Sequence, residues 1–470
     1  MAVVFTEGEV KVRPGLYRRH ENVGFTKPAS ATDGICAIPV QAAWGPLGKV
    51  MKNTTVTDLK SNYGSSDYGA GYTVPAAMAM FDGGASIVYT YRLGTGGTQA
   101  SKKMENLTVT AKYPGTIPIS VAIQAKLGDA TRKQFLVYVD KTQAEVWEFA
   151  ADGKTEGANL IAATANSKYI TVTGDAATVP AVAVASGELT GGTNPTVTNE
   201  DYSNAFAALE TTYYNCIALD VDDDASMTLS RLLQEYMNNA FRMGKLGFYV
   251  VGQKATVPFE TRMSNSASFN DGQGVYLGGG YMAGTVSKDG VLAICKTAGV
   301  IAATPSNKGI THAVFEDATD LCEVLTYDQY AAAINAGMLM LSKSSEGSIW
   351  FDSGVTTLVS PDPNTQDDGW KKIRRVKVRM EMFNRIERAL NPKAGRVSAD
   401  SDGIADIIQT AQRVLNAMVT ERKLLDGATF KEDPANNHNG DSAWFIIQAD
   451  DIDSLEKIYL TYQFRYSQDS

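Results

Sequence analysis

Residues 216–251 decide the fold class, because they place a strand, a helix and a second strand in direct succession. Cys216-Ile-Ala-Leu219 is a short apolar run typical of a buried strand, and Leu246-Gly-Phe-Tyr-Val-Val251 is another. Between them, Ser226–Met243 repeats apolar residues at spacings of three and four, which predicts an amphipathic helix. These residues are Leu229, Leu232, Leu233, Tyr236, Met237 and Phe241. The β-α-β order predicts an α/β layer domain.

The predicted α/β core continues on both sides of residues 216–251, and a segment rich in short predicted strands interrupts it. Residues 101–195 hold short β-prone runs, separated by turn residues such as Pro114-Gly115, with no convincing helix. We therefore expect an inserted all-β domain, a sandwich or a barrel, within a multidomain α+β chain. The expected units are an extended N-terminal arm (1–22), the first part of the α/β core (23–100), the inserted domain (101–195), the second part of the core (196–345), a C-terminal α+β domain (346–456) and a C-terminal strand arm (457–470).

The C-terminal α+β domain is predicted from two helical patterns followed by β-prone runs. A strongly amphipathic helix is expected over Trp370–Leu390, ending at Asn391-Pro392. A second helix is expected from about Asp402 to Leu425. Ala428–Glu432 and Ala443–Gln448 then predict strands ahead of the terminal one.

Both ends of the sequence predict strands. Lys457–Tyr466 alternates strictly with period two, and its apolar face consists of Ile458, Leu460, Tyr462, Phe464 and Tyr466. The first residues are also β-prone, with Val3, Phe5, Val10 and Val12 as the apolar positions. Such strands can form an edge of their own domain, or they can leave it and complete a sheet in a neighbour.

Composition narrows the class of protein. The chain has 470 residues and a net charge of −9, which argues against general nucleic-acid binding. No apolar run approaches the ~18 residues that span a bilayer, and the first residues lack a signal peptide pattern, so we expect no membrane insertion and a protein made and kept in the cytoplasm unless lysis or special export releases it. The four cysteines are far apart and predict reduced thiols, without a disulfide or zinc framework.

Three motifs superficially suggest chemistry. Asp220-Val-Asp-Asp-Asp224 lacks the glycine and glutamate of a calcium loop and better fits a strand-to-helix turn, with Asp223 or Asp224 capping the helix. Gly278-Gly-Gly280 lacks the Lys-Ser/Thr ending of a phosphate loop, and Gly440-Asp441-Ser442 has the wrong flanks for a hydrolase nucleophile. We therefore predict no catalytic, cofactor-binding or metal residues, and no enzyme.

The helix predicted at Trp370–Leu390 is strongly basic, whereas the chain as a whole is acidic. Only Glu381 and Glu387 oppose its cations, so it is either a solvated face or a face that docks on an acidic protein, with nucleic acid a distant third. The cations are Lys371, Lys372, Arg374, Arg375, Lys377, Arg379, Arg385 and Arg388.

The order of several segments resembles the tail sheath proteins of contractile phage tails, including those of Gram-positive phages, defective prophages and R-type bacteriocins. Individually these segments are weak signals, and the resemblance rests on their shared order over most of the chain. They are Arg13-Pro-Gly-Leu-Tyr17, Trp44-Gly-Pro-Leu-Gly48, Leu189-Thr-Gly-Gly192 leading to Asp201-Tyr202, Tyr214-Asn-Cys-Ile-Ala218, Leu325-Thr-Tyr-Asp-Gln-Tyr330, Ala336-Gly-Met338, Gly347-Ser-Ile-Trp350, Gly354-Val-Thr-Thr357, Trp370 with the basic helix, and Ile458-Tyr-Leu-Thr461.

The resemblance implies a mechanical function. Sheath subunits stack as rings around an inner tube, and their terminal arms add strands to sheets of neighbouring subunits. Contraction then drives the tube through the target envelope. The implied partners are further copies of the chain, the tube, the baseplate and the tail terminator, in a particle assembled in the host bacterial cytoplasm and released by lysis. A capsid or surface-layer subunit is the alternative lattice protein.

We expect two sets of residues to make these contacts. The inter-subunit arms would use the apolar positions of both terminal strands given above. The tube would meet the basic helix in the extended state, through Lys371, Lys372, Arg374, Arg375 and Arg379.

Overall fold

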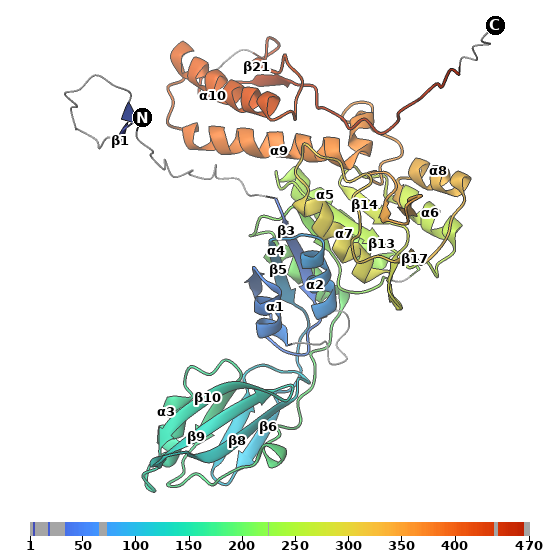
Figure 1. Cartoon of the computed structure of the whole chain (residues 1–470). Helices are drawn as coiled ribbons and strands as arrows, with labels where there is room; N and C mark the ends of the chain where they lie inside the picture. The colour runs from blue at the N-terminus through green and yellow to red at the C-terminus, as the bar shows by residue number, and fades with distance from the viewer. Residues whose placement is uncertain are drawn as a thin grey trace.

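The computed structural model describes residues 3–4, 17–18, 33–64, 73–223, 225–436 and 440–464. Figure 1 shows an elongated molecule with an α/β body in the middle, a β-rich lobe at one end and two long helices across the other. These helices are α9 (Ile373–Leu390) and α10 (Ser401–Thr420). The mixed α/β fold of the sequence prediction is therefore confirmed.

The body is built on a sheet of seven strands in the order β18-β14-β13-β12-β3-β5-β4. All neighbouring strands are parallel except β4, which runs antiparallel to β5. The strands are β3 (Ile35–Val40), β4 (Val50–Asn53), β5 (Ile87–Arg92), β12 (Cys216–Ala218), β13 (Phe248–Gly252), β14 (Gly274–Leu277) and β18 (Met338–Leu339). Segments before and after the β-rich lobe thus complete one sheet.

Both faces of this sheet are covered, because its strands are apolar on both sides. Along β3, Cys36 and Ile38 pack on one face, and Ile35 and Ala37 pack on the other. The first face carries α1 (Val56–Tyr63), α2 (Thr73–Asp82) and α7 (Val291–Ala303), and the second carries α4 (Asn199–Leu209), α5 (Thr228–Arg242), α6 (Phe259–Phe269) and α8 (Tyr327–Asn335).

The lobe contains two three-stranded sheets, β10-β9-β8 and β11-β7-β6, around a core of its own. Their strands are β6 (Ser101–Met104), β7 (Leu107–Ala111), β8 (Ile119–Lys126), β9 (Asp129–Val139), β10 (Thr142–Ala150) and β11 (Ile170–Gly174). The expectation that no helix intervenes here is wrong, because α3 (Glu156–Ala163) packs on the lobe through buried Leu160. Eight residues hold too few apolar positions to reveal a helical period.

Trp44 and Arg92 join the lobe to the body. Trp44 comes from the loop after β3, yet its ring is buried in the core of the lobe, against Tyr113 and Tyr169. The fully buried guanidinium of Arg92 donates hydrogen bonds to the carbonyls of Ala42, Gly45 and Pro114 at 2.8–2.9 Å. Burial lowers the pKa of Arg92 to about 10. These contacts link the body and the lobe at their junction.

The remaining strands form small sheets around the body and beside the long helices. They are β15 (Tyr281–Ala283), β16 (Val286–Lys288) and β17 (Asp320–Leu321), the hairpin β19 (Leu341–Lys343) with β20 (Ile349–Phe351), and the pair β21 (Thr429–Glu432) with β22 (Phe445–Gln448). The last pair packs on α10 through Phe430 and Ile447.

Two predicted element boundaries differ from the structure. The helix expected from Trp370 begins at Ile373, because Asp368–Lys371 forms a 3-10 turn and Lys372 has an extended backbone. The second helix ends at Thr420, five residues earlier than expected, where the chain turns through Arg422 at a φ of 58°.

The terminal strands are described only in part. Residues 457–464 form no strand with the rest of the described chain, so they are not an edge strand of their own domain there, and Tyr466 lies outside the described residues. At the other end, β1 (Val3–Val4) pairs in parallel with β2 (Tyr17–Arg18). Phe5, Val10 and Val12 lie outside the described residues.

Candidate functional site

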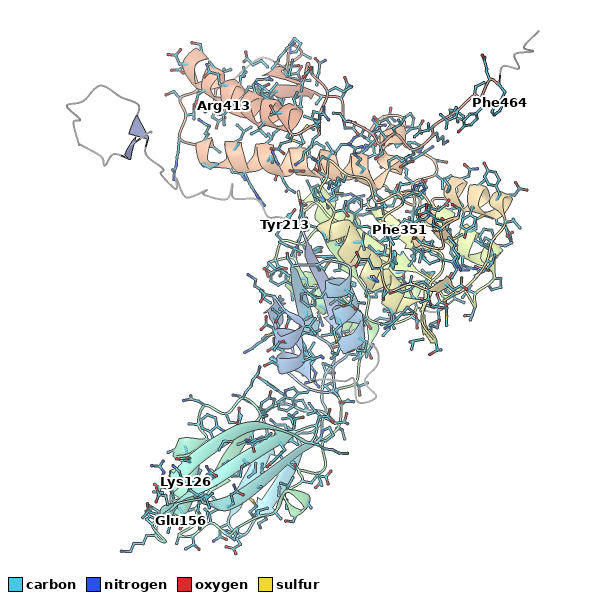
Figure 2. The ribbon with its side chains drawn as sticks, viewed as in Figure 1. Lys126, Glu156, Tyr213, Phe351, Arg413 and Phe464 are labelled. Atoms are coloured by element: carbon cyan, nitrogen blue, oxygen red, sulfur yellow. The ribbon has the colours of Figure 1, made fainter. Side chains whose placement is uncertain are left out.

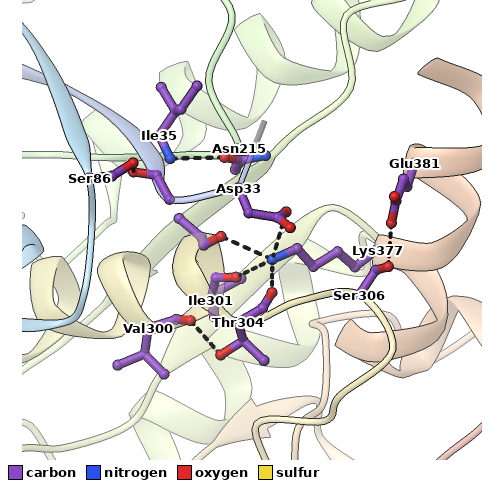
Figure 3. Close-up of polar contacts among 12 residues, drawn as sticks. Asp33, Ile35, Ser86, Asn215, Val300, Ile301, Thr304, Ser306, Lys377 and Glu381 are labelled. Atoms are coloured by element: carbon purple, nitrogen blue, oxygen red, sulfur yellow. Dashed lines mark hydrogen bonds and ion pairs between the residues drawn. The ribbon is translucent and has the colours of Figure 1, made fainter. Parts of the chain in front are cut away.

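Helix α9 is fastened to the body by a nearly buried lysine. Its residues Ile373, Val376 and Met380 pack into the core of the body, which carries Lys377 inward with them. The ammonium group of Lys377 donates hydrogen bonds to the carbonyls of Ile301, Ala302 and Thr304 at the end of α7 (Figure 3). Burial lowers the pKa of Lys377, while the carbonyl ends of α7 suit a cation.

Lys377 also reaches the segment that precedes β3. Its Nζ lies 3.6 Å from an oxygen of Asp33 (Figure 3). Asp33 is two residues before β3, which lies inside the central sheet. The entry of the chain into the central sheet is therefore next to α9.

Residues 451–456, which precede the exposed segment 457–464, lie against the beginning of α9. Arg375 forms a two-pronged ion pair with Asp451, at 2.6 and 3.0 Å, and Arg379 reaches the same carboxylate at 3.0 Å. Arg379 also binds Asp367 at 2.7 and 3.0 Å. Burial raises the pKa of Asp451, but the hydrogen bonds from both arginines outweigh it and hold the pKa below its usual range.

Two further contacts follow along the same segment. Lys372 forms an ion pair with Glu456, and Glu456 accepts a hydrogen bond from the hydroxyl of Thr311 at 2.9 Å. Arg374 donates to the hydroxyl of Ser454 at 2.9 Å. Residues 451–456 thus lie along the start of α9.

The five cations predicted to meet a tube are all engaged within the chain. Four of them contact residues 451–456, and Lys371 pairs with the exposed Asp368 at 2.9 Å. Lys371 and Lys372 lie before the first turn of α9 rather than on the predicted helix. The proposed contact of these cations with a tube stays a prediction. The alternative prediction, a fully solvated helix face, does not describe side chains that are engaged within the chain.

A charged network holds α9 to α10. Glu421, just past the end of α10, binds Arg385 at 2.7 and 2.8 Å and Lys423 at 2.7 Å, and Lys423 also reaches Glu381. Burial raises the pKa of Glu421, but the hydrogen bonds from Arg385 and Lys423 dominate and lower it to about 2. Beside this network, Arg388 and Arg413 help to line a cleft of about 720 Å³.

The pair β21–β22 offers one open strand edge. It contains only two strands among the described residues, and Gln412 of α10 binds the outer edge of β21, where it accepts from Phe430 N–H at 3.0 Å and donates to the carbonyl of Ala428 at 2.8 Å. The outer edge of β22 has no sheet partner there. Phe430 and Phe445 stack at 5.1 Å within it, while Trp444 and Ile446 remain partly exposed. Two strands alone are marginally stable, so this pair depends on α10 and suits further strands.

Beyond β22, the chain leaves the body as an exposed apolar segment. The side chains of Ile458, Leu460, Tyr462 and Phe464 are between 69% and 94% exposed. Figure 2 shows Phe464 on a segment that extends away from the two long helices. Nothing in the described chain covers these residues.

The predicted helix cap at the aspartate run is confirmed. Asp223 accepts hydrogen bonds from the backbone N–H groups of Leu229 and Ser230 in the first turn of α5. Asp222 accepts from Val291 N–H at the start of α7, at 3.0 Å. Across the described residues, no group of three or more histidine, cysteine or acidic side chains is arranged to hold a metal ion.

The sequence reasoning missed the acidic partners of α9. Asp451 and Glu456 stand in the stretch that follows β22, and Asp33 stands just before β3. The only signal was the clustering of Asp450, Asp451, Asp453 and Glu456 in a chain that also holds a basic helix.

No helix in the described part of the chain has the length and apolar character needed to cross a membrane.

Residues 196–357 match the family model of the phage tail sheath protein central domain. The resemblance found in the sequence is thereby confirmed: the chain is similar to sheath proteins of phage tails and of contractile injection systems.

Two proteins of Bacillus subtilis (strain 168) are similar over nearly the whole chain. The phage-like element PBSX protein XkdK is 24% identical, over 97% of this chain and 98% of its own length. The uncharacterized protein YqbK is 22% identical, over 98% of this chain and 99% of its own length.

Solved structures share the fold. The sheath tail protein of Desulfitobacterium hafniense has a TM-score of 0.71 at 20% identity, covering 93% of this chain and 100% of that one. The helical sheath of the anti-feeding prophage in its contracted state has a TM-score of 0.53 at 14% identity, covering 97% of this chain and 99% of that one.

Proposed function

We propose that this chain is the structural subunit of a contractile tail sheath and has no enzymatic activity. Its copies would stack as rings around an inner tube, linked by exchanged terminal strands, and would contract to drive the tube through a cell envelope. The match to a sheath central domain and the shared fold with a contracted sheath support this function.

The proposal includes the organisation and partners of the subunit. Residues 1–22 and 457–470 would act as arms, 23–100 and 196–345 as the core, 101–195 as an inserted domain and 346–456 as the C-terminal domain. The subunit would contact further copies, the inner tube, the baseplate and the tail terminator. It would reside in a phage tail or tail-like particle, assembled in the bacterial cytoplasm and released by lysis.

The exposed C-terminal segment carries this proposal. Apolar side chains that alternate along an extended segment and remain in solvent mark an interaction site. Each backbone hydrogen bond gained in a sheet contributes roughly 0.5–1.5 kcal/mol net. A strand of this kind stabilises a contact while the bodies that it links are free to rotate.

The outer edge of β22 is the acceptor that we propose in a neighbouring copy. An incoming strand would extend this pair by main-chain hydrogen bonds. Its apolar face would cover partly exposed side chains such as Trp444 and Ile446. The acceptor lies in the same C-terminal unit as the arm, so one kind of contact can repeat through a lattice.

Electron microscopy of the protein expressed alone tests the function. We expect hollow ribbed tubes from the full chain and their loss on removal of residues 457–470. Leu460→Asp should also abolish tubes, whereas Thr461→Asp, a control on the opposite face of the predicted strand, should retain them. Monodisperse protein at high concentration, even with a cognate tube added, would refute the proposal.

The tube contact is tested separately. Reversal of Lys371, Lys372, Arg374 and Arg375 to Glu should block extended assembly if these side chains meet the tube. Normal extended tails from this variant would contradict the tube contact.

A further inference from the structure

We propose that helix α9 holds the root of the C-terminal arm, residues 451–456, and that Asp451 and Glu456 are positioning residues that fix where this arm leaves the body. This inference rests on the proposed exchange of arms. It assigns the cations at the start of α9 to a partner within the chain.

Asp451 is the main anchor. Its side chain is 7% exposed and receives three hydrogen bonds, two from Arg375 and one from Arg379. Planar guanidinium groups bind a carboxylate in a fixed geometry, so this contact restrains direction as well as distance. Asp367 binds the other side of Arg379 and holds that arginine in place.

The backbone around Asp451 is restrained as well. Ile452 N–H donates to the carbonyl of Lys423 at 3.0 Å, and Leu425 N–H donates to the carbonyl of Asp450 at 2.8 Å. The arm root therefore adds a short antiparallel bridge to the chain that follows α10, in addition to its ion pairs with α9.

Glu456 marks the other end of the anchored segment. It is held by Lys372 from the start of α9 and by Thr311 from the body. The exposed apolar side chains of the arm begin at the same place, with Leu455 and then Ile458. The anchor thus ends where the segment free for a neighbour begins.

The same stretch of helix is fixed to the body. Lys377 falls between Arg375 and Arg379, and its ammonium group faces Asp33 and the end of α7. At a rise of 1.5 Å per residue, the side chains from 372 to 379 span only about 10 Å along the axis. The turns of helix that hold the arm root are thus themselves held by the body.

A fixed root has a physical advantage for exchange. A strand that leaves the body in one direction loses less conformational freedom on pairing than one on a loose tether. It also presents a higher effective concentration to a site at a set distance. We therefore expect anchor variants to fold but to exchange arms poorly.

A charge swap separates this role from a tube contact. Lys372→Glu and Glu456→Lys each break the pair, and each should cause loss of tubes formed by the protein alone. The double variant restores an ion pair with reversed polarity and should regain them. Normal assembly of both single variants, or failure of the double variant to regain tubes, would overturn the role of Glu456.

Hydrogen exchange in the free subunit tests the anchor without assembly. Asp451→Asn should speed exchange of the Ile452 amide by about tenfold or more, because the ion pairs that hold its bridge are lost. Asp450→Asn removes the same charge one residue away, from an exposed side chain, and should leave that rate unchanged. Equal rates in wild type and Asp451→Asn would overturn the inference.

Assembly of the same two variants completes the test. Asp451→Asn should lose tubes that Asp450→Asn retains. If the wild-type chain forms no tubes even on its tube, the proposed function fails, and the exchange rates still decide whether the anchor exists. If wild type and Asp451→Asn assemble equally well, the anchor does not position the arm.

Discussion

Trp44→Ala should destabilise the β-rich lobe, although Trp44 belongs to a loop of the body. Its side chain is 1% exposed and packs against Tyr113 at 5.1 Å, edge to face, and against Tyr169 at 5.9 Å, stacked. Truncation of a buried tryptophan costs about 3–5 kcal/mol, which includes the cavity that it leaves. At about 1.4 kcal/mol per factor of ten, amides that open with the lobe should exchange roughly a hundred- to several-thousand-fold faster.

Hydrogen exchange resolved along the full chain measures this effect. We expect faster exchange in β7, β8 and β9, with little change in β12 and β13 of the central sheet. Trp444→Ala serves as the control, because that tryptophan is 44% exposed and lies outside the lobe. Wild-type exchange in the lobe of Trp44→Ala would refute the conclusion that this residue is part of the core of the lobe.

Two further predictions concern the body and the long helices. Gly299→Ala should lower the free energy of unfolding by about 2 kcal/mol or more. A Cβ there would lie 2.2 Å from the carbonyl oxygen of Met80 and force α2 and α7 apart. Thermal unfolding of the variant measures this loss of stability. Glu421 has its pKa lowered to about 2, so its contribution to stability is complete above its ordinary value of 4.5 and is lost as the pH falls from there to about 2. The difference in melting temperature between wild type and Glu421→Gln should shrink over that range, and a constant difference would contradict the ion pairs of Glu421.

Elements with a clear period could be predicted from the sequence, and elements without one could not. The strand expected at Leu246–Val251 is β13, which is buried throughout, and the helix expected at Ser226–Met243 is α5, which packs on the sheet through Leu233 and Met237. Helix α6 was missed because its sequence is mostly polar. What holds it is a fully buried arginine, Arg262, which binds the carbonyl of Gly278 and the carboxylate of Glu323.

The partners of the site could not be predicted for a different reason. Arg375 and Asp451 are separated by 76 residues, and no local pattern connects them. Val376 and Met380 of α9 face the core, four residues apart, at a spacing of the kind that predicted an amphipathic helix here. That spacing could not indicate whether the cations on the other sides would meet solvent, another protein or a later segment of the same chain.

The anchor also limits which cations of this region can meet a tube. Asp451 is 7% exposed, whereas Arg375 is 25% and Arg379 13% exposed, so a contact that drew either arginine away would leave a largely buried carboxylate with fewer partners. Such a contact would release the arm root at the same time. Lys371 is different, because its partner Asp368 is exposed and surface pairs contribute only about 0–1 kcal/mol. Lys371→Glu alone should therefore weaken a tube contact without disturbing the arm, whereas Arg375→Glu should disturb the arm whether or not a tube is present.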